Sequence, residues 1–502
     1  MRSVHVGSVL VFASFGALAW NAGCGSNPTN PDGGAGDDGG GGLGGGMFAQ
    51  VDAASHCVNG TICPATNCNS GSETSITGTV LDPAGNNPIP YVAVYVPQHL
   101  TNGGLDPLPL GAHCADCQSL FTNTVLASDI TKSDGTFNIH GLNVPVGQSI
   151  PLVVQAGKWR RLFNVTVNGC TGNAVGNLKL PGKSADGDLP HIAISTGGAD
   201  SLECLLSRVG VDDKEYVDGS SMNGHIHIFQ GGTTGAGNPG PTIDNNTPIS
   251  SKALWDTTTD LQKYDIVLLS CEGAETGTTQ PAALDTYVKV NGGRVFASHF
   301  HYSWFTDTNG PFVSYNLAQW TAGTNDTGNI NAVIETQLPA GGMFPKGQAL
   351  HDWLQLVGAL GAGGVKDELP IQASRYNALV TKNNPNATPW IAGDGNVQSP
   401  GVPGMTQYFS WDEPIGAGTE KLCGRVVYSD LHVGAASDDY GNLPGATNMT
   451  GPAVTTGGVV PTGCHHNAKL SPQEAALEFM LFDLSSCLTP TNTQPPPPMV
   501  AQ

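Results

Sequence analysis

The spacing of hydrophobic and polar positions changes partway along the chain. In its first third, short runs alternate between the two kinds and end at turn residues. Because successive side chains of a strand point to opposite faces, this alternation predicts strands. The runs are 75–81 (SITGTVL), 91–96 (YVAVYV), 150–155 (IPLVVQ) and 161–167 (RLFNVTV). We therefore expect residues 74–182 to form an all-β sandwich.

From about residue 188, buried-type strands alternate with helical patterns. The strand-like runs are 191–195 (HIAIS), 264–269 (YDIVLL), 294–298 (RVFAS) and 425–429 (RVVYS). Helical spacing follows at 200–209 and behind Pro281, and Ser471 with Glu474 forms a capping box before a last helix. Strands that alternate with helices predict a mostly parallel sheet in a three-layer α/β domain, here over residues 188–488.

The N-terminus predicts export and a lipid anchor. The apolar run 9–20 is shorter than the roughly 20 residues that a membrane-spanning helix needs, but it suits a signal peptide over residues 1–23. Ala22 and Gly23 before Cys24 resemble a lipobox, which implies lipidation of the Cys24 thiol. An ordinary secretory signal followed by a structural cysteine is the alternative.

Three further segments are expected to lie outside the folded domains. Residues 24–50 combine the anchor with a Gly-rich linker, residues 51–73 are cysteine-rich, and residues 489–502 form a Pro-rich disordered tail. The chain is thus predicted to be an extracytoplasmic protein of the cell envelope, as an outer-membrane or cell-surface lipoprotein. Its membrane contact would be the lipid on Cys24.

Charge limits the partners. The chain has 41 acidic and 20 basic residues and a formal net charge of −21. Nucleic acids and anionic lipid surfaces attract basic proteins, so nucleic acid is not expected as a partner. A carbohydrate or another protein remains open as a ligand.

Cysteine usage points to an oxidising compartment. Besides Cys24, the disulfide candidates are Cys57, Cys63, Cys68, Cys114, Cys117, Cys170, Cys204, Cys271, Cys423, Cys464 and Cys487. Their odd number leaves one without a partner in the chain. For Cys271 we expect a bond to Cys204. A metal site made by Cys114 and Cys117 with His113 and the group Cys57, Cys63 and Cys68 is the rival interpretation.

The first domain is similar to a known accessory module. The segments that carry the likeness are 78–85 (GTVLDPAG), 90–96 (PYVAVYV), 133–137 (SDGTF) and 144–147 (VPVG). Their order resembles the carboxypeptidase regulatory-like domain, a transthyretin-like sandwich, which implies a non-catalytic role. A long insertion at 97–127 departs from the family. We interpret it as a disulfide-stapled excursion rather than a binding loop.

The second domain resembles the class I glutamine amidotransferase-like fold, and more closely its ThuA-like branch. The matching segments are 264–269 (YDIVLL), 287–299 (YVKVNGGRVFASH), 424–432 (GRVVYSDLH) and 474–484 (EAALEFMLFDL). In amidotransferases a nucleophilic cysteine follows the strand that here ends at Ser298, and this chain has His299 there. The resemblance therefore implies that the amidotransferase nucleophile is absent, and it points to sugar metabolism.

Histidines supply the candidate chemistry. Open α/β sheets bind ligands at the carboxyl ends of their strands, where we expect the histidines to gather. The candidates are His225, His227, Glu272, His299, His301, Asp430 and His432. The five histidines could bind a transition metal such as zinc. Alternatively, His299 or His301 could act as a general base oriented by Glu272 or Asp430. Polar histidines on a wet or satisfied strand are the plain alternative.

Two functions follow. One is a binding or scaffold role for a surface lipoprotein whose amidotransferase-like domain lacks its nucleophile. The other is an extracytoplasmic hydrolase or lyase that acts on a carbohydrate-related substrate through the histidine cluster, with or without a bound metal. Whether the protein is an enzyme depends on whether His299, His301 and His432 converge.

Overall fold

The computed structural model describes about seven-tenths of the chain. The described residues are 68, 72–114, 120–121, 124–140, 146, 149–232, 240, 246–277, 281–323, 326–381, 383–393, 405–432, 464, 469–490 and 493–500. All of them belong to one compact unit, Ala53–Gln502. The expected signal peptide, Cys24 and the Gly-rich linker lie outside the described residues. The division into separate domains stays a prediction.

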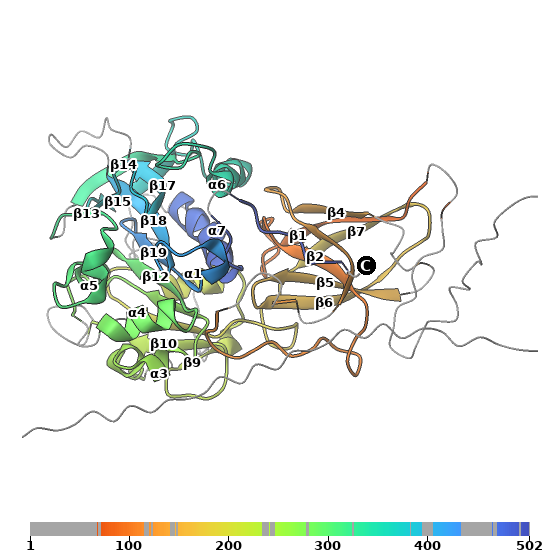
Figure 1. Ribbon diagram of the computed structural model, residues 1–502, viewed down its shortest axis with the longest axis horizontal. Helices are drawn as coiled ribbons and strands as arrows, with labels where there is room; N and C mark the ends of the chain where they lie inside the picture. Colours follow the sequence, from red (N-terminus) through yellow and green to blue (C-terminus); the bar gives the residue numbers. More distant parts are fainter. Residues whose placement is uncertain are drawn as a thin grey trace, which may run out of the picture. The chain divides into compact units, whose positions relative to one another are not determined.

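The first seven strands form two facing sheets (Figure 1). One sheet has the order β4-β1-β7 and the other β3-β2-β5-β6. The strands are β1 (Ser75–Leu81), β2 (Ala93–Pro97), β3 (Val125–Ile130), β4 (Thr136–His140), β5 (Ser149–Ala156), β6 (Trp159–Thr166) and β7 (Gly172–Lys179). Ile76 of β1 and Val154 of β5 are fully buried in one shared core. The four predicted runs correspond to β1, β2, β5 and β6, and β3, β4 and β7 complete the two sheets. The family likeness stays a prediction.

A ten-stranded sheet follows, in the order β15-β14-β17-β18-β19-β12-β11-β8-β10-β9. Its strands are β8 (Ile192–Thr196), β9 (Tyr216–Asp218), β10 (Ile226–Gln230), β11 (Ile266–Leu269), β12 (Arg294–Ser298), β14 (Asp326–Ile334), β15 (Leu369–Arg375), β17 (Thr388–Gly393), β18 (Thr406–Glu413) and β19 (Gly424–Ser429). A separate two-stranded ribbon joins β13 (Gln319–Trp320) and β16 (Ala378–Leu379).

Only one half of the large sheet is parallel. Neighbours from β19 to β9 run parallel, whereas those from β15 to β19 run antiparallel. The expectation of a mostly parallel sheet is therefore wrong for this half. The long helix among the described residues of 326–413 is α6 (Pro345–Leu356), which lies between β14 and β15. It does not act as a parallel crossover, because these two strands pair antiparallel.

Helices cover both faces of the large sheet. They are α1 (Leu202–Arg208), α2 (Lys252–Trp255), α3 (Thr258–Leu261), α4 (Pro281–Lys289), α5 (Tyr302–Thr306), α6 (Pro345–Leu356) and α7 (Pro472–Ser485), with short 3-10 turns at Asp213–Glu215, His299–His301, Pro311–Tyr315 and Thr419–Lys421. Ile194 of β8 packs in the core that contains α1, α6 and α7, and its neighbour Ala193 packs with α2, α4 and α5. The protein is thus a mixed α/β structure. No described helix is long and apolar enough to cross a membrane.

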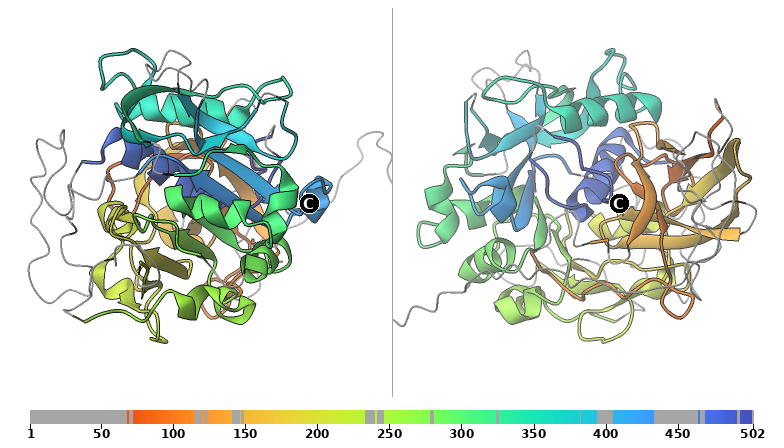
Figure 2. Two further views of the ribbon diagram at one scale, coloured as in Figure 1. Left: turned by 90° about the vertical axis from the view of Figure 1, so that its left-hand side faces the viewer. Right: turned by 45° about the vertical axis from the view of Figure 1, so that its right-hand side comes forward.

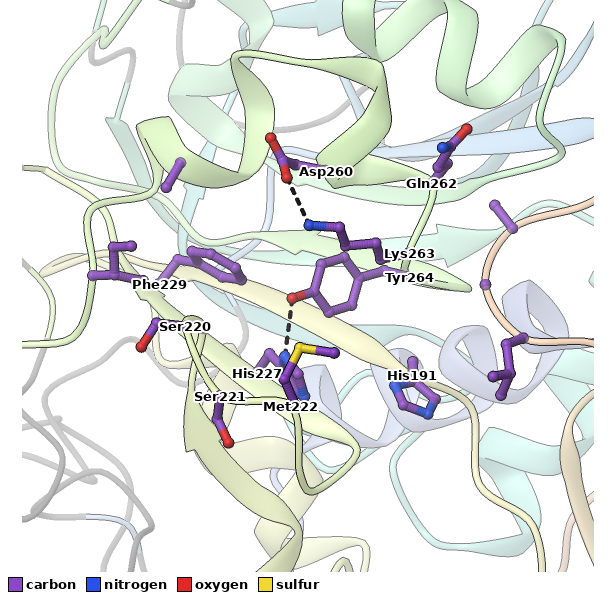
Figure 3. Close-up of a pocket in the computed structure, with 16 residues that line it drawn as sticks. His191, Ser220, Ser221, Met222, His227, Phe229, Asp260, Gln262, Lys263 and Tyr264 are labelled. Atoms are coloured by element: carbon purple, nitrogen blue, oxygen red, sulfur yellow. Dashed lines mark hydrogen bonds and ion pairs between the residues drawn. The ribbon is translucent and has the colours of Figure 1, made fainter.

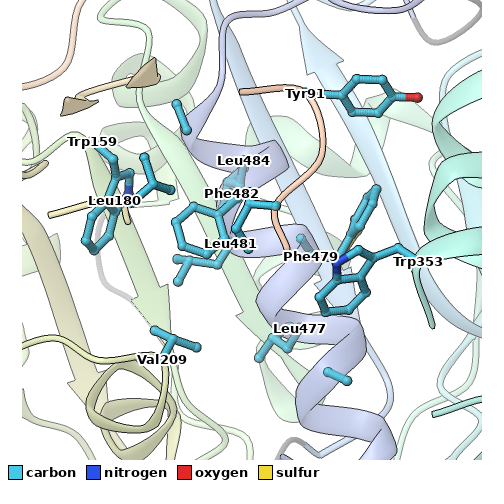
Figure 4. Packing of buried hydrophobic residues seen from close by; sticks show 14 of the residues in the cluster. Tyr91, Trp159, Leu180, Val209, Trp353, Leu477, Phe479, Leu481, Phe482 and Leu484 are labelled. Atoms are coloured by element: carbon cyan, nitrogen blue, oxygen red, sulfur yellow. The ribbon is translucent and has the colours of Figure 1, made fainter. Parts of the chain in front are cut away.

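Helix α7 joins the sandwich to the large sheet. The expected capping box is present, because Ser471 and Glu474 exchange side-chain hydrogen bonds with each other's backbone. The rings of Phe482 and Trp159 of β6 meet edge to face, with their centroids 5.7 Å apart (Figure 4). The ring centroids of Phe479 and Trp353 of α6 are 5.9 Å apart. Figure 2 shows α7 beside the sandwich strands. One continuous apolar core therefore spans both sheet systems.

Buried acidic groups of α7 are matched by groups from other elements. Asp483 accepts hydrogen bonds from Lys346 Nζ at 2.6 Å and from Arg425 Nη1 at 2.8 Å. Burial alone would raise the pKa of Asp483, but the charges of Lys346 and Arg425 lower it. Glu474 pairs with Arg208 of α1. These pairs link α7 to α1, α6 and β19.

The insertion between β2 and β3 is fastened to the large sheet. Cys114 is bonded to Cys423, and the Ala112 amide donates to Gln262 O at 3.0 Å. Lys158 of the β5–β6 turn donates to Gly111 O at 2.8 Å and pairs with Asp265. The expected disulfide staple of the insertion is present, and its partner cysteine lies in the α/β part of the chain. Since Cys114 is in a disulfide, the rival metal site built on it is wrong.

Two other disulfides join Cys68 to Cys170 and Cys204 to Cys464. The expected bond between Cys204 and Cys271 is therefore wrong, and Cys271 is a free, buried thiol. Cys487 is also disulfide-bonded. The candidates Cys57, Cys63 and Cys117 lie outside the described residues.

We predict that Asp483→Asn destabilises the protein by about 3–5 kcal/mol, because Lys346 and Arg425 would be left buried beside a neutral amide. Chemical denaturation would measure the loss. Asp367→Asn is the control, since the partner of this carboxylate, Lys366, is 87% exposed and such pairs contribute at most about 1 kcal/mol. A similarly small loss for both variants would contradict the account.

A second prediction concerns Glu478 of α7, which accepts from Asn87 Nδ2 at 2.7 Å. Burial, together with the charge of Asp82, raises the pKa of Glu478 well above its ordinary value. The folded state therefore holds this proton more tightly than the unfolded state. Its contribution to stability is complete below the unfolded pKa and is lost as pH rises through the folded pKa.

Across that window we expect stability to fall by up to about 1.4 kcal/mol per pH unit. Glu478→Gln should flatten the decline, because the amide has no proton to lose. Urea denaturation between pH 5 and pH 8 would compare the two proteins. Equal slopes for parent and variant would be inconsistent with a buried proton on Glu478.

Candidate metal centre

Three neighbouring parallel strands bring their carboxyl ends together. They are β11, β12 and β19, which lie side by side in the large sheet. Cys271 comes just after β11, His299 directly after β12 and His432 just after β19. Chain segments far apart in the sequence thus meet at one edge of the sheet, where open α/β sheets place their ligands.

The three side chains form a compact, buried group. Cys271 Sγ lies 3.4 Å from His299 Nδ1, and the rings of His299 and His432 are 5.1 Å apart. One ligand atom from each residue lies within 4.8 Å of the other two. In tetrahedral zinc sites a sulfur and a nitrogen ligand are about 3.6 Å apart. The arrangement is therefore suited to binding a transition metal.

The turn at His299 directs its imidazole toward Cys271. His299 has a φ of +37°, a left-handed conformation that is uncommon outside glycine. Its carbonyl oxygen accepts a hydrogen bond from the Tyr428 hydroxyl of β19 at 2.9 Å. The neighbouring strand thus helps to hold the strained turn in place.

His301 does not join the group. We expected residues 299–301 to be extended, with both imidazoles on one side, but they form a 3-10 helix. This turn rotates His301 away, so that its Nδ1 lies 3.1 Å from Ser298 O and its ring packs against Trp304. Burial lowers the pKa of His301 to about 4, so the ring is neutral at neutral pH.

His225 and His227 lie at the opposite end of the strands. His227 is the second residue of β10 and His225 precedes this strand, so both are at its amino end. His225 Nδ1 is 2.6 Å from Glu215, and His227 Nδ1 is 2.9 Å from the Tyr264 hydroxyl. The prediction that all the histidines share the carboxyl edge is therefore wrong for this pair.

The electrostatics of the group fit a metal ligand set. Burial raises the pKa of the Cys271 thiol to about 12, and a bound cation would be needed to hold it as a thiolate. Burial, and then the charges of His299 and Arg375, lower the pKa of His432, so its ring is in the neutral form that binds metals. His432 Nε2 is buried with no hydrogen-bond partner among the described residues. A metal ion would satisfy this costly unpaired nitrogen.

Carboxyl groups surround the three ligands. Asp430 Oδ1 lies 2.7 Å from the hydroxyl oxygen of Tyr428, and Oδ2 accepts a hydrogen bond from the Ala378 amide at 2.9 Å. Burial raises the pKa of Asp430 to about 7. Burial also raises the pKa of Glu272, which accepts a bond from Thr276. Asp430 is thus linked through Tyr428 to the backbone of His299.

Two members of this site were missed in the sequence. Cys271 was assigned to a disulfide, although its position after a parallel strand beside the one ending at Ser298 was a usable signal. Asp200 accepts from Ser298 Oγ at 2.7 Å, and nothing in its local sequence indicates this contact.

Comparisons with known proteins leave the family open. No family model matches the chain. No curated protein matches it either. Among solved structures, a protein from Bacteroides uniformis described as ThuA-like is 9% identical, with a TM-score of 0.26 over 48% of this chain and 81% of its own. A 9R-lipoxygenase from Cyanothece is 14% identical, with a TM-score of 0.14 over 23% of this chain and 18% of its own. The first is a distant ThuA-like neighbour for part of the chain.

We predict that Cys271 resists alkylation in the folded protein, because its thiol is buried and protonated. Iodoacetamide treatment followed by peptide mapping should find Cys271 unmodified in buffer and fully modified in denaturant. Rapid labelling of the folded protein would contradict the buried position of this thiol.

Proposed function

We propose that this chain is an extracytoplasmic metal-binding protein that holds zinc, or a similar transition metal, at Cys271, His299 and His432. The observation that carries the proposal is the convergence of these three buried ligands at the carboxyl edge of the sheet. A thiolate with two imidazoles suits zinc better than calcium or magnesium, which prefer oxygen ligands.

The proposed location is the cell envelope. The apolar run before Cys24 supports export and lipid attachment, and the disulfides are compatible with an oxidising compartment. In this view the β-sandwich is an accessory module. A long flexible linker behind the anchor would let the folded part reach partners away from the membrane.

A second candidate function is hydrolysis or elimination on a carbohydrate-related substrate. The observation that favours it is the number of protein ligands, which is three among the described residues. Catalytic zinc sites usually have three protein ligands, whereas structural sites usually have four. Zinc bound in this way would supply a Lewis acid and a coordination position for water. The chain's own contribution would be to orient the ligands, with Asp430 and Glu272 as the nearby carboxyl groups.

Metal analysis of the full chain, purified after export to an oxidising compartment, tests the proposal. We expect about one equivalent of bound metal in the parent protein. Cys271→Ala and His432→Ala each remove a direct ligand. Loss of a residue that only hydrogen-bonds a ligand lowers metal affinity roughly 10- to 100-fold, so each of these variants should lower it by more than that. Titration with zinc against a competing chelator would give the affinities.

His301→Ala is the matched control, because His301 is equally buried and lies close by in sequence but outside the ligand group. It should keep the parent's affinity. Absence of binding in the parent, or an equal loss in all three variants, would refute the proposed site.

A further inference from the structure

A separate pocket of about 680 Å³ lies near the amino ends of the parallel strands (Figure 3). His227 of β10, His191 before β8 and Tyr264 before β11 all line it. The volume is within the roughly 300–1,000 Å³ that small-molecule sites have. Because the proposed metal ligands follow the opposite ends of these strands, the pocket is a distinct site.

The walls of the pocket are mainly apolar and aromatic. The rings of Phe229 and Tyr264 meet edge to face at 6.0 Å. Leu110 and Met222 also line it, yet these side chains are 84% and 94% exposed. Two large apolar side chains exposed beside one pocket would be covered in part by a ligand that occupies it.

The stapled insertion completes the pocket. Leu110 and Ala112 come from the insertion between β2 and β3, which the disulfide from Cys114 to Cys423 and the hydrogen bond to Gln262 hold against the large sheet. The wall is thus fixed in advance, and a ligand would not have to order it on binding.

Hydrogen bonding at the base of the pocket sets the polarity of the ligand. His227 Nε2 lies 3.1 Å from Asn223 O, and because a carbonyl oxygen only accepts, this nitrogen must carry the hydrogen. His227 Nδ1 is then an acceptor for the Tyr264 hydroxyl at 2.9 Å. With its hydrogen committed to His227, the Tyr264 oxygen is left as an acceptor for a ligand.

The charged groups nearby are already paired. Asp260 accepts from Lys263 at 2.8 Å, and Glu215 lies 2.6 Å from His225. Burial lowers the pKa of both His191 and His227, so these rings are neutral at neutral pH. The described residues that line the pocket therefore offer aromatic surface and a neutral acceptor, and their two charged side chains, Asp260 and Lys263, pair with each other.

We propose that this pocket binds a small uncharged aromatic compound, which packs against Phe229 and Tyr264 and donates one hydrogen bond to the Tyr264 oxygen. Indole and 1-methylindole are suitable probes, because they share the ring system and only indole has an N–H donor. Calorimetric titration of the full chain would measure both affinities.

We expect the parent to bind indole several-fold more tightly than 1-methylindole. Tyr264→Phe keeps the ring but removes the acceptor, so it should weaken indole binding roughly 3- to 10-fold, as expected for one neutral hydrogen bond, and leave 1-methylindole unchanged. Met222→Asp places a charge on an exposed wall residue and should weaken both probes without disturbing the fold.

Absence of binding for both probes would overturn the proposal. Binding that Met222→Asp leaves unchanged would place the ligand elsewhere and would overturn it as well. Equal affinities for the two probes in the parent, unaltered by Tyr264→Phe, would rule out the assigned role of the Tyr264 oxygen.

Discussion

The structure depends on the burial of helix α7 between the sandwich and the large sheet. A helix that is buried on all sides is expected to be apolar, yet α7 carries Glu474, Glu478 and Asp483 into the core. Each acid has a partner from another part of the chain. Glu474 pairs with Arg208, and Glu478 accepts a hydrogen bond from Asn87. Asp483 pairs with both Lys346 and Arg425. Apolar packing alone would allow α7 to slide or rotate, and these pairs fix its register against the strands that hold the candidate site.

The site follows from strand order more than from any local motif. β11, β12 and β19 are neighbours, so the residues after them meet although more than 150 positions separate Cys271 from His432. Their burial has two opposite effects. It makes the thiolate form of Cys271 costly in the absence of a cation, and it would strengthen the attraction for a cation that arrives. At the other end of the same strands, neutral imidazoles and aromatic rings form a pocket of different chemistry.

The sequence predicted those elements whose signals are local. Alternation predicted β1, β2, β5 and β6, and Ser471 with Glu474 marked the start of α7, because pleating and capping depend on residues a few positions apart. Features set by tertiary contacts were predicted less well. The positive φ of His299 is held by Tyr428 from another strand, and without this contact an extended conformation was the natural expectation. The partner of Cys204 is Cys464, which lies 260 residues away, and no spacing rule could identify it.

Three predicted metal ligands lie outside the group, for reasons that residue spacing cannot show. His225 and His227 have the alternating spacing of His-x-His, but spacing cannot show which end of a strand faces a site. His301 has the spacing as well, and one 3-10 turn removes it from the group. The composition of the ligand set therefore depends on backbone direction and local helix type, both of which are decided by the packed sheet.

The most direct test of the central claim is a crystal structure of the zinc-loaded full chain, with anomalous diffraction data collected on both sides of the zinc absorption edge. We predict one anomalous peak, from a zinc ion bound by Cys271 Sγ and by a ring nitrogen of each of His299 and His432 at about 2.0–2.3 Å. A zinc-loaded crystal in which the ion binds elsewhere, or in which the three side chains point apart, would contradict it.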